Sequence, residues 1–180
     1  MSKRRASIFV GLGAATALAF TGTAGVFSQS ASAASYPIYP VLAYWANSAD
    51  TIIVAINGRA EKVRMIGIDA PEATSRDNTK KGCYAIQAKL LLKNIIHKQF
   101  VRLEKDAKMP DRYTDGSLLR YVYVPDYGDV GATMIYNGGA KEYMYQHKNY
   151  GSRSWYKTLQ NLAYGRNVGI WSSSICPMNR

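Results

Sequence analysis

The sequence is poor in the side chains that bind zinc. Its 180 residues include only two histidines, His97 and His147, and two cysteines, Cys83 and Cys176. The cysteines lie far apart and form no CxxC pair, so a zinc site is not expected. Acidic residues are also few, with 12 Asp and Glu against 23 Lys and Arg and a formal charge of +11. This excess favours a polyanionic partner such as nucleic acid or a cell-wall polymer, although a basic surface can also simply aid solubility.

A long apolar run is found at the N-terminus. Basic residues precede an apolar stretch over about 8–27, and a small-residue A-x-A site ends at Ala33. This order predicts a secretory signal peptide over 1–33 and a domain over 34–180. An uncleaved anchor is the alternative, because about 20 apolar residues can span a bilayer. Cleavage leaves 20 basic and 12 acidic residues, a formal charge of +8, and we expect a secreted bacterial protein with no stable membrane association.

The two cysteines have three possible states. An even number of cysteines in an exported chain suggests a disulfide. A bond between Cys83 and Cys176 would close a loop of roughly 90 residues and stabilise the fold by roughly 4 kcal/mol on the chain-entropy model. Two free thiols or a metal-binding pair are the alternatives.

The rest of the chain has no internal repeat and no low-complexity segment. A β-branched run at 51–56, the Asn57-Gly58 turn signal and a second arm at 62–68 predict a β-hairpin. After a Tyr- and Pro-rich lead-in at 34–48 and a polar loop at 74–82, we expect strands at 99–104 and 118–124 and helices at 83–97, 129–137 and 152–166. In the first helix the apolar positions include Ile86, Leu90 and Ile95, and in the last Trp155, Leu159, Leu162 and Ala163 share one face. Short strands with helices inserted late fit a small α+β barrel and not a doubly wound sheet.

Carboxylates gather at one end of the predicted hairpin. Asp69 and Glu72 flank Pro71, which ends the second arm, and the hairpin returns Asp50 to the same end. Two carboxylates brought together repel unless a cation lies between them, and oxygen ligands suit Ca²⁺ or Mg²⁺. The alternative is that Asp50 and Asp69 are ordinary turn residues.

Arg64 alternates in phase with Ile66 and Ile68, a row that a barrel would bury at least partly. An arginine in that row needs an anion to offset its desolvation. A structural partner would be Glu61 or Glu104, and a functional one would be a phosphate. A metal, a carboxylate that orients water and a guanidinium in one small volume together can hydrolyse a phosphodiester.

The string RMIGIDAPE from Arg64 to Glu72, preceded by Asp50-Thr51, resembles the staphylococcal nuclease family. The similarity covers roughly 44–176, and further motifs follow in the family's order. They are Asp111-Arg112-Tyr113, the strand at 118–123, Gly139 to Tyr143, and Gly169 to Trp171. Cys83 and Cys176 also stand where exported bacterial relatives often place a cysteine pair.

The resemblance implies an α+β fold, a five-stranded OB-fold β-barrel with about three helices, and a monomer. It implies Ca²⁺-dependent hydrolysis of DNA and RNA that leaves 3′-phosphorylated products. Asp50, Asp69 and the backbone carbonyl of Ala70 correspond to calcium ligands, Glu72 to the residue that activates water, and Arg64 to the phosphate-binding arginine. Three tyrosines correspond to nucleotide-contacting aromatics, with structural packing as the alternative for the last two: Tyr113, Tyr143 and Tyr145.

One loop departs from the family's pattern. The family has a second catalytic arginine just before the strand at 118–123, where this chain has Ser117, and Thr114 and Asp115 form an insertion. Arg120 has the wrong strand parity to replace the arginine, whereas Arg112 in the longer loop is a candidate to fold back as a catalytic residue. Loss of one charge-stabilising donor typically costs about 10² to 10³ in rate. The sequence therefore predicts a weakened nuclease or a nucleic-acid-binding module, and more remotely a cell-surface protein that binds wall polymers.

Overall fold

The structure is a computed structural model that describes residues 41–72 and 82–177. The chain divides into two units, Met1–Ala34 and Ser35–Arg180, and every described residue lies in the second. The predicted signal peptide at 1–33 and most of the polar loop predicted at 74–82 lie outside the described residues.

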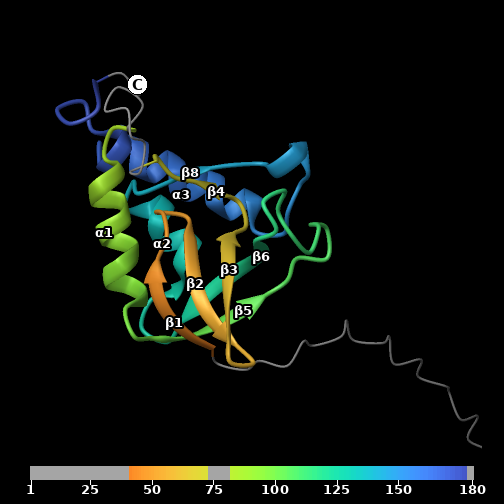
Figure 1. Ribbon diagram of the computed structural model, residues 1–180. Coiled ribbons are helices and arrows are strands. Elements are labelled where there is room, and N and C mark those ends of the chain that lie inside the picture. The colour runs from red at the N-terminus through yellow and green to blue at the C-terminus, as the bar shows by residue number, and fades with distance from the viewer. Residues whose placement is uncertain (1–40, 73–81, 178–180) are drawn as a thin grey trace, which may run out of the picture. The chain divides into compact units, whose positions relative to one another are not determined.

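Five strands close into a barrel (Figure 1). The order is β3 (Arg59–Met65), β2 (Thr51–Ile56), β1 (Val41–Ala46), β5 (Phe100–Glu104) and β6 (Leu118–Val124), and parallel pairing of β3 with β6 completes the ring. The predicted hairpin is confirmed, because β2 and β3 pair in register around Asn57 and Gly58, whose φ angles are 50° and 75°. Two short strands, β4 (Ile68–Asp69) and β8 (Lys141–Glu142), form a separate pair, and β7 (Gly128–Asp129) extends the sheet beside β6. The α+β OB-fold barrel expected from the sequence is confirmed.

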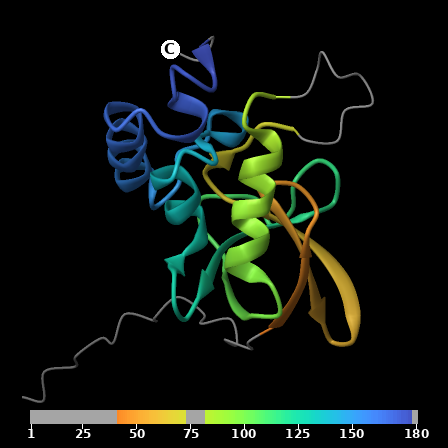
Figure 2. The ribbon, with the colours of Figure 1, turned by 90° about the vertical axis from the view of Figure 1, so that its left-hand side faces the viewer.

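Among the described residues, three α-helices accompany the barrel and leave the side of the β2–β3 hairpin uncovered (Figure 2). α1 (Ala85–Ile96) packs on β1, whereas α2 (Val130–Tyr136) contacts β6 and α3 (Arg153–Gly165). Asp129 caps α2 by accepting a hydrogen bond from the Ala132 N–H at 3.1 Å. Two 3₁₀ turns follow, η2 (Tyr145–His147) and η3 (Gly169–Trp171). Within the two described ranges, no helix has the length and apolarity needed to cross a bilayer.

The helices were predicted in the right places, but their buried faces were partly wrong. Ile86 and Leu90 of α1 are 60% and 50% exposed, and Trp155 and Leu162 of α3 are 54% and 47% exposed. Small residues allow a helix to approach a sheet closely, and α1 uses two alanines for this. The buried residues are Ala85, Ala88, Leu92, Ile95 and Ile96 in α1, and Tyr156, Leu159 and Ala163 in α3.

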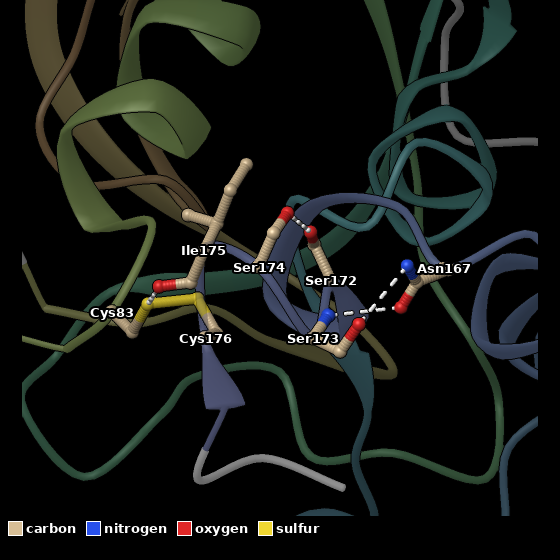
Figure 3. Close-up of a disulfide and its surroundings, with 7 residues drawn as sticks. All are labelled: Cys83, Asn167, Ser172, Ser173, Ser174, Ile175 and Cys176. Carbon is tan, nitrogen blue, oxygen red and sulfur yellow. Dashed lines mark hydrogen bonds between the residues drawn. A yellow bond between two sulfur atoms is a disulfide. The ribbon is translucent and has the colours of Figure 1, made fainter.

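A disulfide joins Cys83, just before α1, to Cys176 near the C-terminus (Figure 3). The two Cα atoms are 5.7 Å apart. Hydrogen bonds also fix the segment before Cys176. The Ser173 N–H donates to Asn167 Oδ1 at 2.9 Å, and the Cys176 N–H donates to the Ser172 carbonyl at 2.7 Å. Of the three states open at the sequence level, the structure has the disulfide.

A buried carboxylate, that of Asp106, ties the loop after β5 to the start of α3. Its side chain accepts hydrogen bonds from the Tyr121 hydroxyl at 2.7 Å, the Gly151 N–H at 2.6 Å and the Lys108 N–H at 2.8 Å. Burial raises the pKa of this carboxyl, but the three donors outweigh burial, and the net effect is a lowered pKa. Asp106 is 7% exposed, so its ionised form is held in place by the fold.

Loss of the disulfide should lower the free energy of unfolding by roughly 4 kcal/mol, because the bond restricts the unfolded chain. The comparison is urea unfolding of the oxidised protein against a Cys83→Ala/Cys176→Ala variant. A reducing agent should destabilise the parent and leave the variant unchanged. Equal stability of parent and variant would contradict a stabilising role for the bond.

Replacement of Asp106 by Asn should destabilise the protein at pH 7 by about 1–3 kcal/mol, because it weakens hydrogen bonds to a charged acceptor. A carboxyl whose pKa is lowered by folding stabilises above its unfolded pKa of about 3.9 and loses that contribution as pH falls through the lower folded value. The difference between parent and variant should therefore shrink between pH 5 and about pH 2 in urea unfolding. Asp126→Asn, at an exposed position, is the matched control; a pH-independent difference for Asp106→Asn would argue against the ionised carboxylate.

Candidate functional site

The register of the β2–β3 hairpin brings Asp50 and Arg64 together. Thr51 pairs with Arg64, and the Met65 N–H donates to the Asp50 carbonyl at 2.9 Å. The chain then turns at Gly67 and enters β4, which carries Asp69. Asp50, Arg64 and Asp69 therefore meet at one end of the barrel, as the hairpin predicted.

The turn at Gly67 is fixed by Tyr143 and Tyr150, which follow β8 in the chain. Its φ of +80° suits glycine, and a Cβ there would overlap the Tyr150 ring. The Gly67 carbonyl accepts hydrogen bonds from the Tyr143 N–H at 3.0 Å and from the Tyr150 hydroxyl at 3.1 Å. The path from Arg64 to Asp69 is thus held by residues far along the chain.

Arg64 lies between the two aspartates. One of its terminal nitrogens, NH2, is 3.0 Å from Asp50 Oδ2 and 3.3 Å from Asp69 Oδ1, and its side chain is 19% exposed. The structural partners expected from the sequence, Glu61 and Glu104, are therefore wrong.

The error arises from strand alternation and register. Glu61 has the opposite strand parity to Arg64 and contacts Arg112, whereas Glu104 pairs with Arg102 on its own strand. Val63 and Met65 are the fully buried positions of β3, whereas Arg64 is half-buried, and Ile66 and Ile68 after it are buried, so the expected partial burial of that row is confirmed. Long-range pairing, and not spacing along β3, decides which acid Arg64 meets.

The two carboxylates differ in exposure. Asp50 is 4% exposed and accepts hydrogen bonds from the hydroxyls of Ser48 at 2.7 Å and Thr51 at 2.8 Å. A longer contact of 3.4 Å joins its Oδ2 to the Ala70 N–H. Asp69 is more open, with its side chain 34% exposed, and Lys141 Nζ lies 3.4 Å from its Oδ2. Asp50 is therefore a rigid acceptor, and Asp69 is the one that solvent reaches.

The oxygens at this end of the barrel fit part of a calcium shell. Asp50 and Asp69 converge on a single guanidinium nitrogen, and Ala70 follows directly with a backbone carbonyl. Calcium prefers such hard oxygen ligands and fills the remaining positions with water. Among residues 41–72 and 82–177, no group of three or more His, Cys, Asp or Glu side chains could hold a metal by itself. The three calcium ligands thus stay a prediction.

Glu72 stands at the open end of the same segment. Its side chain is exposed, and in the described part of the chain its carboxylate forms no ion pair or hydrogen bond. Its backbone carbonyl accepts from the Gly82 N–H at 3.1 Å, so the segment that leaves the site returns beside it. A cavity of about 390 Å³ adjoins this point, lined by Asp69, Ala70, Pro71, Gly82, Cys83, Lys141, Ile170 and Trp171. Glu72 is therefore exposed to solvent at the edge of the site, and its role stays a prediction.

One of the three predicted aromatic residues, Tyr113, lies beside Arg64 with its side chain partly exposed. The Tyr113 ring lies 4.7 Å from Arg64 Cζ, and its centroid is 4.5 Å from that of Tyr145. We call Tyr113 and Tyr145 the aromatic pair. Tyr145 is only 8% exposed and belongs to the hydrophobic core, and Tyr143 packs against that core and donates its backbone N–H to the Gly67 carbonyl. The structure therefore gives both of these tyrosines a packing role, which was the alternative for them. The stacking of Arg64 on Tyr113 was not anticipated from the sequence, because it joins residues 49 positions apart.

The inserted loop pairs its acid with a lysine of β3. Asp115 Oδ2 is 2.7 Å from Lys62 Nζ, and its Oδ1 accepts the Ser117 N–H at 3.0 Å. The hydrogen bond from Lys62 is the largest of the effects that hold the pKa of Asp115 well below its usual range. Ser117 is 2% exposed; its hydroxyl lies near that carboxylate, yet it makes no hydrogen bond of good geometry with the described residues.

Neither nearby arginine contacts the two aspartates. Arg112 donates to the Gly116 carbonyl at 2.7 Å and to Glu61 at 3.3 Å. Arg120 binds Asp111 at 2.9 Å, as its strand parity indicated. Arg112 thus folds back onto its own loop and β3, and its catalytic role stays a prediction.

Lys62 and Lys141 are charged neighbours that sequence reasoning missed. Lys141 reaches Asp69 because β4 and β8 pair, and Lys62 reaches Asp115 because β3 runs beside the start of β6. No local pattern marks either residue, since both contacts depend on strand pairing across the chain.

Comparison with known proteins gives consistent matches. A family profile described as "Staphylococcal nuclease homologue" matches residues 62–173. The "Thermonuclease" of Staphylococcus hyicus is 35% identical over 128 residues, which cover 69% of this chain and 70% of that protein. The "Thermonuclease" of Staphylococcus intermedius is 35% identical over 126 residues, with 68% and 70% covered. An "Uncharacterized endonuclease" of Escherichia coli is 30% identical over 125 residues, with 69% and 72% covered. With its barrel, its helices and these matches, the chain belongs to the staphylococcal nuclease family.

Proposed function

We propose that the protein is a secreted, Ca²⁺-dependent nuclease that hydrolyses phosphodiester bonds of DNA and RNA and leaves 3′-phosphorylated products. The observation that carries the proposal is the convergence of Asp50, Asp69 and Arg64 beside Tyr113. Two carboxylates, a guanidinium and an aromatic ring together match the needs of a phosphodiester flanked by a base. The relatives named thermonuclease and endonuclease support the same activity.

Asp50, Asp69 and the carbonyl oxygen of Ala70 would hold the calcium ion, which when bound supplies positive charge beside the phosphate and positions water. Arg64 donates hydrogen bonds to the phosphate oxygens, where negative charge grows during the reaction. Its stacking on Tyr113 lets the guanidinium exchange a carboxylate for a phosphate without losing that contact.

Glu72 accepts a proton from the attacking water. As the water oxygen bonds to phosphorus, the bond from phosphorus to the 5′ oxygen breaks. The departing 5′ oxygen takes a proton from solvent, and the phosphate stays on the 3′ oxygen. The exposed Glu72 carboxylate lies three residues after Asp69 and has no other partner in the described ranges, which suits this task.

One observation favours a second function. Ser117 stands where the resemblance places a catalytic arginine, and Arg112 and Arg120 are engaged elsewhere. A barrel with this loop could hold a nucleic-acid strand without cutting it efficiently. The intact set of Asp50, Arg64, Asp69 and Glu72 favours the enzyme, because a binding module has no need for all four.

Replacement of Glu72 by Gln should lower kcat by about 10² to 10⁴, because the water loses its proton acceptor. The assay follows cleavage of single-stranded DNA by the parent in Ca²⁺, the parent in EGTA, and Glu72→Gln in Ca²⁺. Glu104→Gln, which removes the same charge from an exposed ion pair on β5, should retain full activity. Equal cleavage in all arms would exclude this enzyme, and retention of DNA without cleavage would identify the binding module.

Replacement of Ser117 by Arg should raise kcat, with an upper limit of about 10² to 10³ if the guanidinium fully replaces the missing donor. Ser117 is buried, so Ser117→Met controls for the longer side chain without its charge. Thermal unfolding of both variants verifies that they fold. A folded Ser117→Arg protein with the kcat of Ser117→Met would show that this position does not face the substrate phosphate.

A further inference from the structure

A cationic pocket, whose lining includes neither Asp50 nor Asp69, lies at the N-terminal end of α3. A pocket of about 260 Å³ is lined there by Lys108, Asn149, Tyr150, Gly151, Arg153, Ser154 and Lys157. Lys108 comes from the loop after β5, and the other residues come from two adjacent parts of the chain. Asn149, Tyr150 and Gly151 precede α3, whereas Arg153, Ser154 and Lys157 lie in the first turns of α3 itself. We name this the basic pocket.

The two segments that line the basic pocket also hold the aromatic pair. Segment 106–113 ends at Tyr113 and segment 145–151 begins at Tyr145, and these two rings are in contact. At the other end of the segments, the Gly151 N–H donates to Asp106 at 2.6 Å. The segments therefore run side by side in opposite directions from the aromatic pair to the basic pocket. Tyr113 lies five positions after Lys108, so their Cα atoms are at most about 18 Å apart.

The acids near the pocket are already satisfied by other donors. Asp106 is 7% exposed and accepts three hydrogen bonds. Glu142, whose side chain is 10% exposed, accepts hydrogen bonds from Arg153 and from the Tyr150 hydroxyl. Lys108 and Lys157 are exposed and form no ion pair with any described carboxylate. The charge that reaches solvent in the pocket is therefore positive.

We propose that the basic pocket binds a backbone phosphate of the substrate strand, a few nucleotides from the bond that is cut, through Lys108 and Lys157. The proposal rests on the proposed nuclease function and adds a subsite to it. OB-fold domains bind roughly 4–16 nucleotides of single strand, so a strand that contacts Tyr113, the partly exposed member of the aromatic pair, extends beyond the site. The first turn of α3 has no acidic residue, so its N-terminal end adds to the positive potential. A phosphate is the part of the strand that such a cationic, sequence-indifferent pocket recognises.

The test compares short and long strands in binding measurements. A Lys108→Gln/Lys157→Gln variant and its parent, both carrying Glu72→Gln, are titrated in Ca²⁺ with fluorescent single strands of about 3 and about 12 nucleotides. Each lost phosphate contact should weaken binding of the long strand about fivefold at 0.1 M salt and reduce the slope of log K against log salt by about 0.7. Affinity for the short strand should stay within about twofold, because it does not reach the pocket.

The matched control is Lys93→Gln/Lys98→Gln, which removes the same charge from exposed positions on α1 and the turn after it. Figure 1 places α1 on the opposite side of the barrel from the loop before β6. An equal loss for both strand lengths, an equal loss in the control, or no loss in a folded variant would each overturn the proposal. Cleavage of the long strand is measured separately with the protein that retains Glu72. A protein that binds the long strand through the pocket but does not cleave it would contradict the nuclease function and not the subsite.

Discussion

The site depends on one ion-pair arrangement, in which the Arg64 guanidinium holds two carboxylates. Asp50 is almost fully buried and Asp69 lies beside it, so without a cation their repulsion would oppose the fold. A buried charge that loses its partner is strongly destabilising, so Arg64 has a structural task as well as a chemical one. The same charge balance explains why a cation and a phosphate suit this place: the cation satisfies the aspartates, and the phosphate satisfies the arginine.

The geometry of that arrangement is set by elements far from it in sequence. Asp50 and Arg64 are aligned by the hairpin, which is local, but Asp69 is placed by the Gly67 turn. The Tyr150 hydroxyl and the Tyr143 N–H both bind the Gly67 carbonyl, and Tyr150 also donates to Glu142 of β8. The residues that lead into α3 therefore support the end of the barrel that carries Asp50, Arg64 and Asp69, and they also line the basic pocket. Binding of a strand in that pocket would act on the same segment that fixes the site.

Sequence reasoning succeeded where structure is local and failed where it is long-range. The Asn57-Gly58 hairpin and the positions of the helices follow from turn chemistry and periodicity, and the resemblance supplied the site residues. The apolar positions named for α1 and α3 are only partly buried. Ile86 and Leu90 are four residues apart on an exposed face of α1, and Trp155 is exposed although it lies four residues before the buried Leu159. The acid that pairs with Arg64 and the contact of Lys141 with Asp69 are set by strand pairing, which the spacing of residues along one strand does not encode.

We expect the inserted loop to affect the rate of cleavage more than the affinity for nucleic acid. Asp115 adds a negative charge near the barrel end, but Lys62 pairs with it at 2.7 Å, so the insertion does not leave an uncompensated acid facing a phosphate. What the loop lacks, compared with the family's pattern, is a positive group at Ser117, and on the proposed function we expect that difference to affect the transition state more than the bound strand. The basic surface away from the aspartates is untouched by this change. On the proposed function, we expect such a chain to retain its hold on nucleic acid while it cuts more slowly, with binding and turnover set by different parts of one barrel.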